Sequence, residues 1–219
     1  MSRTITVKGI GRATAKPDTV VLSMSLDSRA AEYSKAMEIA AGSISDITQT
    51  LMDAGFEKDS VKTTNFNVRT DYENVKDNRS GQYHREFRGY VVAHNLKLEF
   101  DFDMKQLSRA LSAIAGCPAH PQLSISFVVK ETTVVNEEML RSATENARRK
   151  AEVLCDAAGV VLGKLLSINY NWGELNICSP TQYGVAEECL VAPMMARSID
   201  IVPDDIDVSD TATFIWEIE

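Results

Sequence analysis

The chain has 219 residues, of which 44% are apolar and 25% are charged, and its formal net charge is −8. A chain of this length buries enough surface to fold without a metal or a disulfide framework. Its negative charge repels phosphate backbones, so nucleic acid is not an expected partner. These values predict a soluble globular protein that needs no cofactor.

The N-terminal residues 1–7 alternate between polar and apolar types, as a strand does. They lack the charged region and apolar run of a signal peptide. No segment approaches the ~18 consecutive apolar residues of a membrane helix. The sequence therefore predicts a cytoplasmic protein with no membrane span.

Hydrophobic periodicity divides the rest of the chain into strands, with period two, and helices, with period near 3.6. The predicted elements are strands at 4–15 and 20–26, a long helix at 30–54, strands at 61–72 and 90–100, a short helix at 104–115, a strand at 123–129, a long helix at 135–158, and strands at 164–170 and 212–218.

Alternating strands indicate antiparallel sheets with one face covered. The expected fold class is therefore α+β, with two long helices and one short helix packed on one face and the order ββαββαβαββ. The order within residues 20–130 resembles a ferredoxin-like arrangement. We expect one domain over 1–219, with lobes at 20–130 and at 131–219 plus 1–19.

The second long helix carries an apolar stripe that ends at Gly159, a typical helix stop. The stripe is predicted from residues spaced by three or four: Leu140, Ala143, Ala147, Ala151, Leu154 and Ala158. Gly9 and Gly11 interrupt the first strand. A dinucleotide fingerprint needs a third glycine where Thr14 stands, so these glycines indicate a bulge or close packing instead.

Histidines and acidic residues supply no complete metal site. His94 alternates in register with apolar neighbours, so a hydrogen-bonded core histidine is predicted, whereas His84 lies at a polar hairpin tip. Cys117 and His120 have half of a zinc spacing, with no matching second pair. The acidic run that begins at Asp204 lacks the glycine and closing glutamate of a calcium loop. It is predicted to be a solvated turn before the last strand, and its members are Asp204, Asp205, Asp207 and Asp210.

The four cysteines are widely spaced and do not indicate a disulfide framework. Cys155 lies on a helix beside Leu154, which indicates partial burial. Cys117, Cys178 and Cys189 fall in predicted loops, so they are the candidate redox thiols. Cys178 and Cys189 could pair in an oxidising compartment.

A loop over 172–196 is rich in Gly, Pro, Cys and Met. Long loops are often functional, and apolar, Met-rich segments often form interfaces. The sequence therefore predicts a partner or self-association surface here, with the candidate residues Trp172, Tyr183, Leu190, Met194 and Met195.

Several local patterns together resemble the SIMPL-domain family, whose biochemical function is largely unknown. They are the opening strand 5–11 with Pro17-Asp18, the segments Gly55-Phe56 and 61–66, Gly89-Tyr90, and the run 147–163. The resemblance covers residues 4–219. It implies a protein with no agreed catalytic residues, often exported, with some members linked to oxidative-stress defence or signalling partners.

The leading hypothesis is a non-enzymatic SIMPL-like protein that self-associates as a scaffold or stress-defence assembly. It predicts a homo-oligomer and allows a protein partner. The first alternative is a module that binds a small apolar molecule between sheet and helices. The second is a thiol-based redox enzyme.

Overall fold

The computed structural model describes residues 3–76, 82–170, 177–181, 183–185 and 202–219. The chain forms two compact units. The first unit comprises Met1–Asp18, Phe127–Thr181 and Pro203–Glu219, and the second comprises Thr19–Ser126 and Gln182–Val202. The α+β class with antiparallel sheets is confirmed, whereas the single-domain assignment stays a prediction.

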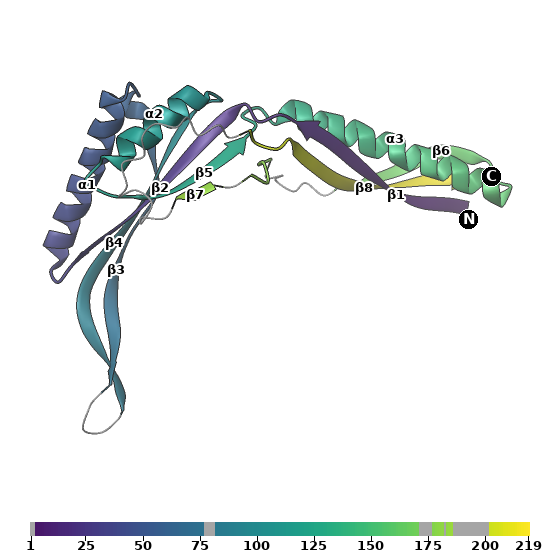
Figure 1. Cartoon of the computed structure of the whole chain (residues 1–219). Helices are drawn as coiled ribbons and strands as arrows, with labels where there is room; N and C mark the ends of the chain where they lie inside the picture. The colour runs from purple at the N-terminus through teal and green to yellow at the C-terminus, as the bar shows by residue number, and fades with distance from the viewer. Residues whose placement is uncertain (1–2, 77–81, 171–176, 182, 186–201) are drawn as a thin grey trace. The chain divides into compact units, whose positions relative to one another are not determined.

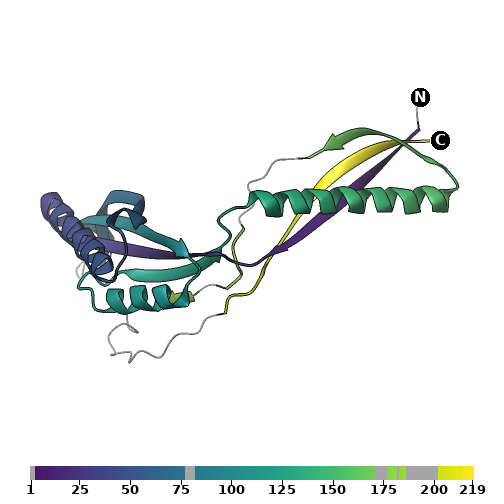
Figure 2. The same cartoon turned by 90° about the horizontal axis from the view of Figure 1, so that it is seen from above.

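The first unit is a three-stranded antiparallel sheet with one long helix packed on it (Figure 2). Its elements are β1 (Arg3–Ala15), α3 (Thr133–Ala158), β6 (Leu162–Asn169) and β8 (Ile206–Ile218), and the strand order is β1-β8-β6. The two ends of the chain pair along their full strands, from Arg3 with Ile218 to Ala15 with Ile206. The predicted helix stop is also confirmed, since Gly159 caps α3 in the left-handed region at φ 68°.

Close packing of α3 on β1 explains the two glycines of the first strand. A Cβ atom at Gly9 would lie 2.1 Å from the carbonyl oxygen of Ala143, and one at Gly11 would lie 2.0 Å from that of Met139. No side chain fits at such distances, so the sequence-based expectation of close packing is confirmed. The helix backbone lies directly on the strand backbone.

The buried stripe of α3 follows a strict spacing of four residues. Its members are Val135, Met139, Ala143, Ala147, Ala151 and Cys155. The expectation that Leu154 and Ala158 face the core is wrong, because both residues are exposed, Leu154 by 52%. A row spaced by four drifts around a 3.6-residue helix, so α3 follows the twist of the strand beneath it and Cys155 takes the inward position.

Polar side chains of α3 bind the outer backbone edge of β1. The amide of Arg12 donates to Ser142 Oγ at 3.2 Å, and the amide of Ile10 donates to Asn146 Oδ1 at 3.0 Å. Lys150 Nζ donates to the carbonyl of Lys8 at 3.1 Å. Four helical residues rise about 6 Å and two strand residues about 6.6 Å, so the two repeats match. This side-chain ladder closes an edge that could otherwise pair with another strand.

The second unit contains a five-stranded sheet of order β3-β4-β2-β5-β7, with helices packed on it (Figure 1). Its elements are β2 (Thr19–Ala30), α1 (Tyr33–Asp53), the 3-10 turn η1 (Lys58–Ser60), β3 (Val61–Lys76), β4 (Tyr83–Asp101), α2 (Met104–Ala115), β5 (Gln122–Val128) and β7 (Tyr183–Val185). Helix α1 contacts β2, β4 and α2. Ala36, Ala40 and Val92 form a buried cluster where α1 meets the sheet.

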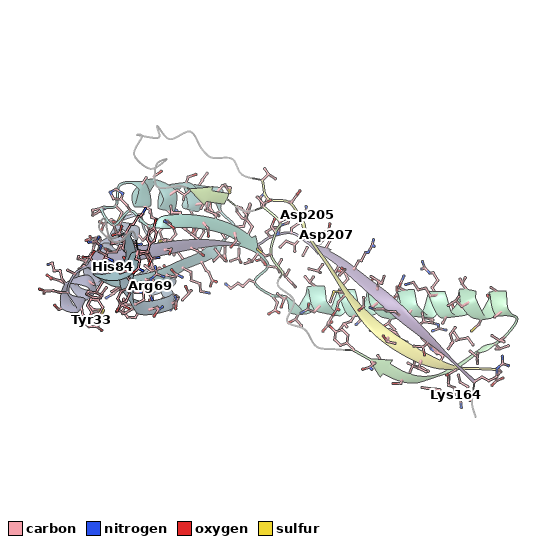
Figure 3. All side chains as sticks on the ribbon, turned by 90° about the horizontal axis from the view of Figure 1, so that it is seen from below. Tyr33, Arg69, His84, Lys164, Asp205 and Asp207 are labelled. Carbon is pink, nitrogen blue, oxygen red and sulfur yellow. The ribbon has the colours of Figure 1, made fainter. Side chains whose placement is uncertain are left out.

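Two segments that were expected to lack regular structure contain strand residues instead. The last strand begins at Ile206, so Asp207 and Asp210 belong to β8 and not to a turn, as Figure 3 shows for Asp207. The Thr14 hydroxyl donates to Asp207 Oδ1 at 2.6 Å, which places this carboxylate in the sheet. The short strand β7 lies in the predicted loop. Pairing with a distant strand determines that these residues are extended, β1 for the start of β8 and β5 for β7. The periodicity of the local sequence does not show such pairing.

Helix α2 begins at a side-chain cap that the sequence analysis did not single out. Asp103 Oδ1 accepts from the amides of Lys105 at 2.8 Å and Gln106 at 3.4 Å. We expect Asp103→Ala to lower the free energy of unfolding by about 1 kcal/mol, because two helix N–H groups lose their acceptor. Urea unfolding checks this value. Asp103→Asn retains an acceptor and should restore most of the loss, and an unchanged midpoint for Asp103→Ala would contradict the cap.

Candidate functional site

The long β3–β4 hairpin is the candidate site. Strand β2 pairs with β4 only from Tyr90 to Asp101. In the described part of the chain, the outer hairpin at 71–76 and 83–89 is therefore a two-stranded ribbon, which extends beyond α1 (Figure 1). Two-stranded ribbons are only marginally stable alone in water. Among the parts of this sheet, the ribbon would therefore gain the most stability from pairing with a partner.

Aromatic side chains form a continuous row along one face of the hairpin, here called the aromatic ladder. Tyr33, at the start of α1, meets Tyr90 edge-on with ring centroids 5.6 Å apart. Tyr90 meets Phe87 at 5.4 Å, and Phe87 meets Tyr72 at 5.6 Å. The guanidinium of Arg85 lies 4.7 Å from the Tyr72 ring centroid and ends the row. Each edge-to-face pair stabilises the ladder modestly, by about 1 kcal/mol.

One ring of the ladder adjoins the core, and the rings on either side of it along the row are exposed. Tyr90 packs against the buried cluster under α1, whereas the side chains of Tyr72 and Phe87 are 45% and 46% exposed. Exposed aromatic rings that continue a core are typical of a binding surface. The ladder therefore exposes apolar surface on the hairpin beside the first residue of α1.

Charged residues occupy the alternate positions of the same strands. Arg88 pairs with Glu73 at 2.7 Å, and Arg29 pairs with Asp71 at 3.3 Å. Asp71 and Glu73 flank Tyr72 on β3, and successive side chains of a strand point to opposite faces, so these two carboxylates lie on the face opposite Tyr72. The exposure of both ion pairs makes them weak contributors to stability, and they leave the ladder uncharged apart from Arg85.

The edge of β3 differs from the closed edge of β1. Strand β3 has 16 residues, and among the described residues it has a sheet neighbour on one side only. In the part of the chain that the structure describes, no hydrogen bond joins a helix side chain to the outer backbone of β3, in contrast to the bonds of Ser142 and Asn146 to β1. Proteins usually shorten or cover such edges, so an edge strand of this length is a candidate pairing surface.

His94 lies in the core of the second unit, as the sequence predicted. It is 6% exposed, and its Nε2 lies 2.9 Å from Thr63 Oγ1. Its ring meets Phe66 edge-on at 5.2 Å. The predicted hydrogen bonding of His94 is only partly confirmed, because within the described residues its Nδ1 has no hydrogen-bond partner. Burial lowers the pKa of His94 below its usual 6.5.

The lowered pKa of His94 predicts a pH dependence of stability. The unfolded chain binds this proton more readily than the folded protein, so unfolding becomes easier as the pH falls through about 6.5. We expect a lower urea midpoint at pH 5.5 than at pH 7.5 (about one unit either side of that pKa), and a smaller difference in His94→Gln. His84→Gln, on the exposed ribbon, is the matched control. An equal pH dependence in all three proteins would contradict the assignment.

The structure places only part of the sequence-predicted interface loop. Trp172, Leu190, Met194 and Met195 lie outside the described residues. Tyr183 begins β7 and pairs in register with Ile125 of β5. The described residues thus place one of the five candidates at the edge of the five-stranded sheet, and the interface role of the loop stays a prediction.

The candidate thiols are not brought together in the described residues. Cys117 is a free cysteine with 1% exposure, Cys155 is equally buried, and Cys178 is half-buried. Cys178 forms an isolated bridge with Val128, and Cys189 lies outside the described residues. Burial shields Cys117 from oxidants, so Cys178 is the more accessible of the described candidates.

Neither a metal cluster nor a membrane helix is found in the described ranges. No three His, Cys, Asp or Glu side chains gather there closely enough to hold a metal ion. None of the helices there has both the length and the apolar character that crossing a bilayer requires.

Comparison with known protein families gives a match over nearly the whole chain. The model of the SIMPL family, described as a protein of unknown function (DUF541), matches residues 5–216. The chain belongs to the SIMPL family. This match confirms the resemblance read from the sequence, and the family description assigns no activity.

Two curated relatives of this SIMPL protein are both named "26 kDa periplasmic immunogenic protein". The protein from Brucella melitensis biotype 1 is 26% identical over 165 residues, and the one from Brucella abortus strain S19 is 25% identical over the same length. Each alignment covers 75% of this chain and 65% of the relative. The chain thus spans about two thirds of the length of these relatives.

The cytoplasmic prediction is wrong, because both relatives are named periplasmic proteins. That prediction rested on the alternation of residues 1–7, which do not have a signal-peptide pattern, and on the absence of a membrane span in the sequence. A folded domain has the same strand pattern and needs no membrane span in either compartment, so neither feature could decide the location.

Sequence reasoning missed the aromatic ladder, although a signal was present. Tyr72 precedes the predicted polar tip, and Phe87 and Tyr90 follow it. The predicted first arm ends at residue 72, and the predicted second arm begins at residue 90. The structure extends both arms past these points, and only cross-strand pairing brings the rings together.

Proposed function

We propose that this SIMPL protein is a non-enzymatic scaffold that self-associates through the β3–β4 hairpin. One observation carries the proposal: among the described residues, a 16-residue edge strand has no neighbour on its outer side and lies beside a row of half-exposed aromatic rings. The other sheet closes its corresponding edge with helix side chains. The contrast within one chain supports the open edge as a functional feature.

The partner we propose is a second copy of the chain. Antiparallel pairing of β3 with β3 would satisfy the outer backbone groups of both strands, which is strand addition with two-fold symmetry. The ladders of the two copies would then continue one another across the new sheet. Burial of Tyr72 and Phe87 would supply the apolar contribution that backbone pairing alone lacks.

The location and wider role rest on the comparisons and the family resemblance. We propose a periplasmic location, as the names of the two relatives suggest. A stress-defence role for the assembly is supported by the family resemblance alone. The predicted interface segment 172–196 contains Tyr183 of β7, the opposite edge strand of the same sheet, and we propose this segment as a second contact of the assembly.

The native mass of the purified protein tests the proposal. Light scattering on a sizing column, across a series of protein concentrations, should give a multiple of the 24.2 kDa chain mass. The multimer should survive moderate dilution and dissociate at the lowest concentrations. A constant mass of one chain at every concentration would refute self-association.

A further inference from the structure

A second surface, in the other unit, carries an inference that does not depend on self-association. A groove of about 410 Å³ runs between β1 and α3. Ligand sites typically measure roughly 300–1,000 Å³. Its lining residues are Ile10, Arg12, Ser142, Glu145, Asn146, Arg149 and Lys150.

The groove is cationic in an acidic protein. Arg12, Arg149 and Lys150 bring three positive charges and Glu145 one negative charge, so the local net charge is +2. No ion pair found among the described residues includes any of these three cations. Two unpaired guanidiniums on one groove are typical of oxyanion recognition, because their planar N–H forks match oxygen pairs.

The hydrogen bonds that close the β1 edge also determine which atoms face the groove. Asn146 uses its Oδ1 to accept from Ile10 N, so its Nδ2 protons remain for another acceptor. Ser142 Oγ accepts from Arg12 N, which leaves its hydroxyl proton free to donate. Lys150 donates one proton to the Lys8 carbonyl and has two more. The amides of β1 thus occupy the side-chain oxygens of Asn146 and Ser142, and the hydrogen-bond donors of these side chains remain for a ligand in the groove.

We propose that this groove binds an organic phosphate. A phosphomonoester has several acceptor oxygens and a charge of about −2 near neutral pH, which matches both the donors and the local charge. A single carboxylate would balance half of that charge. The half-exposed Ile10 offers an apolar contact for the organic part of the ligand. The phosphate could belong to a free small molecule or to a phospholipid headgroup.

Calorimetric titration with inorganic pyrophosphate, in buffer without phosphate, tests the proposal. We expect saturable binding that weakens with added sodium chloride. Arg12→Gln and Arg149→Gln should each weaken binding roughly tenfold, the loss of one charge-assisted contact. Arg141→Gln is the matched control, because Arg141 lies on the same helix, outside the groove, and its loss changes the net charge equally.

A gain-of-function variant protects the test against misfolding. Glu145→Gln removes the one carboxylate of the groove and should tighten pyrophosphate binding several-fold, which a damaged fold cannot do. Sedimentation with phosphatidylcholine vesicles, with and without phosphatidic acid, distinguishes the two sources. Binding to the acidic vesicles alone assigns a headgroup, and binding to pyrophosphate alone assigns a free phosphate. Absence of both, or an equal loss in Arg141→Gln, would overturn the site.

Discussion

Gly11→Ala is expected to destabilise the first unit by about 3 kcal/mol or more, the upper range for overpacking a core. The added methyl would lie 2.0 Å from the carbonyl oxygen of Met139. That oxygen belongs to the helix backbone and cannot move by a change of rotamer. Helix α3 must therefore lift from β1, which also breaks the amide bonds to Ser142 and Asn146.

Fluorescence of Trp216 during urea unfolding measures this loss, because Trp216 stacks on Phe214 in the core of this unit. A Trp172→Phe background leaves Trp216 as the single tryptophan of the chain. Gly42→Ala is the matched control, since a Cβ there meets nothing within 4 Å. It should leave the midpoint unchanged or raise stability by up to ~1 kcal/mol. A wild-type midpoint for Gly11→Ala would mean that α3 does not lie directly on β1.

Tyr72→Ser combined with Phe87→Ser is expected to convert the proposed multimer into single chains. Buried aromatic residues at the centre of an interface contribute about 2 kcal/mol each or more, so each loss weakens association about 30-fold. Both rings are half-exposed in the isolated chain, so the variant should still fold. Light scattering across the same concentrations as for the wild type measures the change in mass.

Val153→Ser is the control for the loss of an exposed apolar side chain, because Val153 is 61% exposed on α3, in the other unit. It should retain the wild-type mass at every concentration. A double variant that associates as the wild type does would remove the ladder from the interface. If the control dissociates as well, the contact lies in the first unit instead.

The local structure of this protein follows from patterns within short stretches of its sequence. Alternation over 90–100 reports a strand, and a stripe with a glycine at 159 reports a helix and its end, because both signals depend on neighbours only a few residues away. His94 was placed in the core by the same alternation. The order of the elements and the family resemblance follow from these local signals.

Contacts between distant segments are visible in the folded chain and in no local pattern. The reason for the close packing at Gly9 and Gly11 is helix α3, which lies more than 120 residues away in the sequence. Asp207 belongs to a strand because β1 pairs with it, and Cys155 replaces Leu154 inward because the helix follows a twisted strand. The aromatic ladder and the cationic groove each combine residues from separate elements. Such sites depend on register and on the contacts between elements, which the pattern of a single segment does not contain.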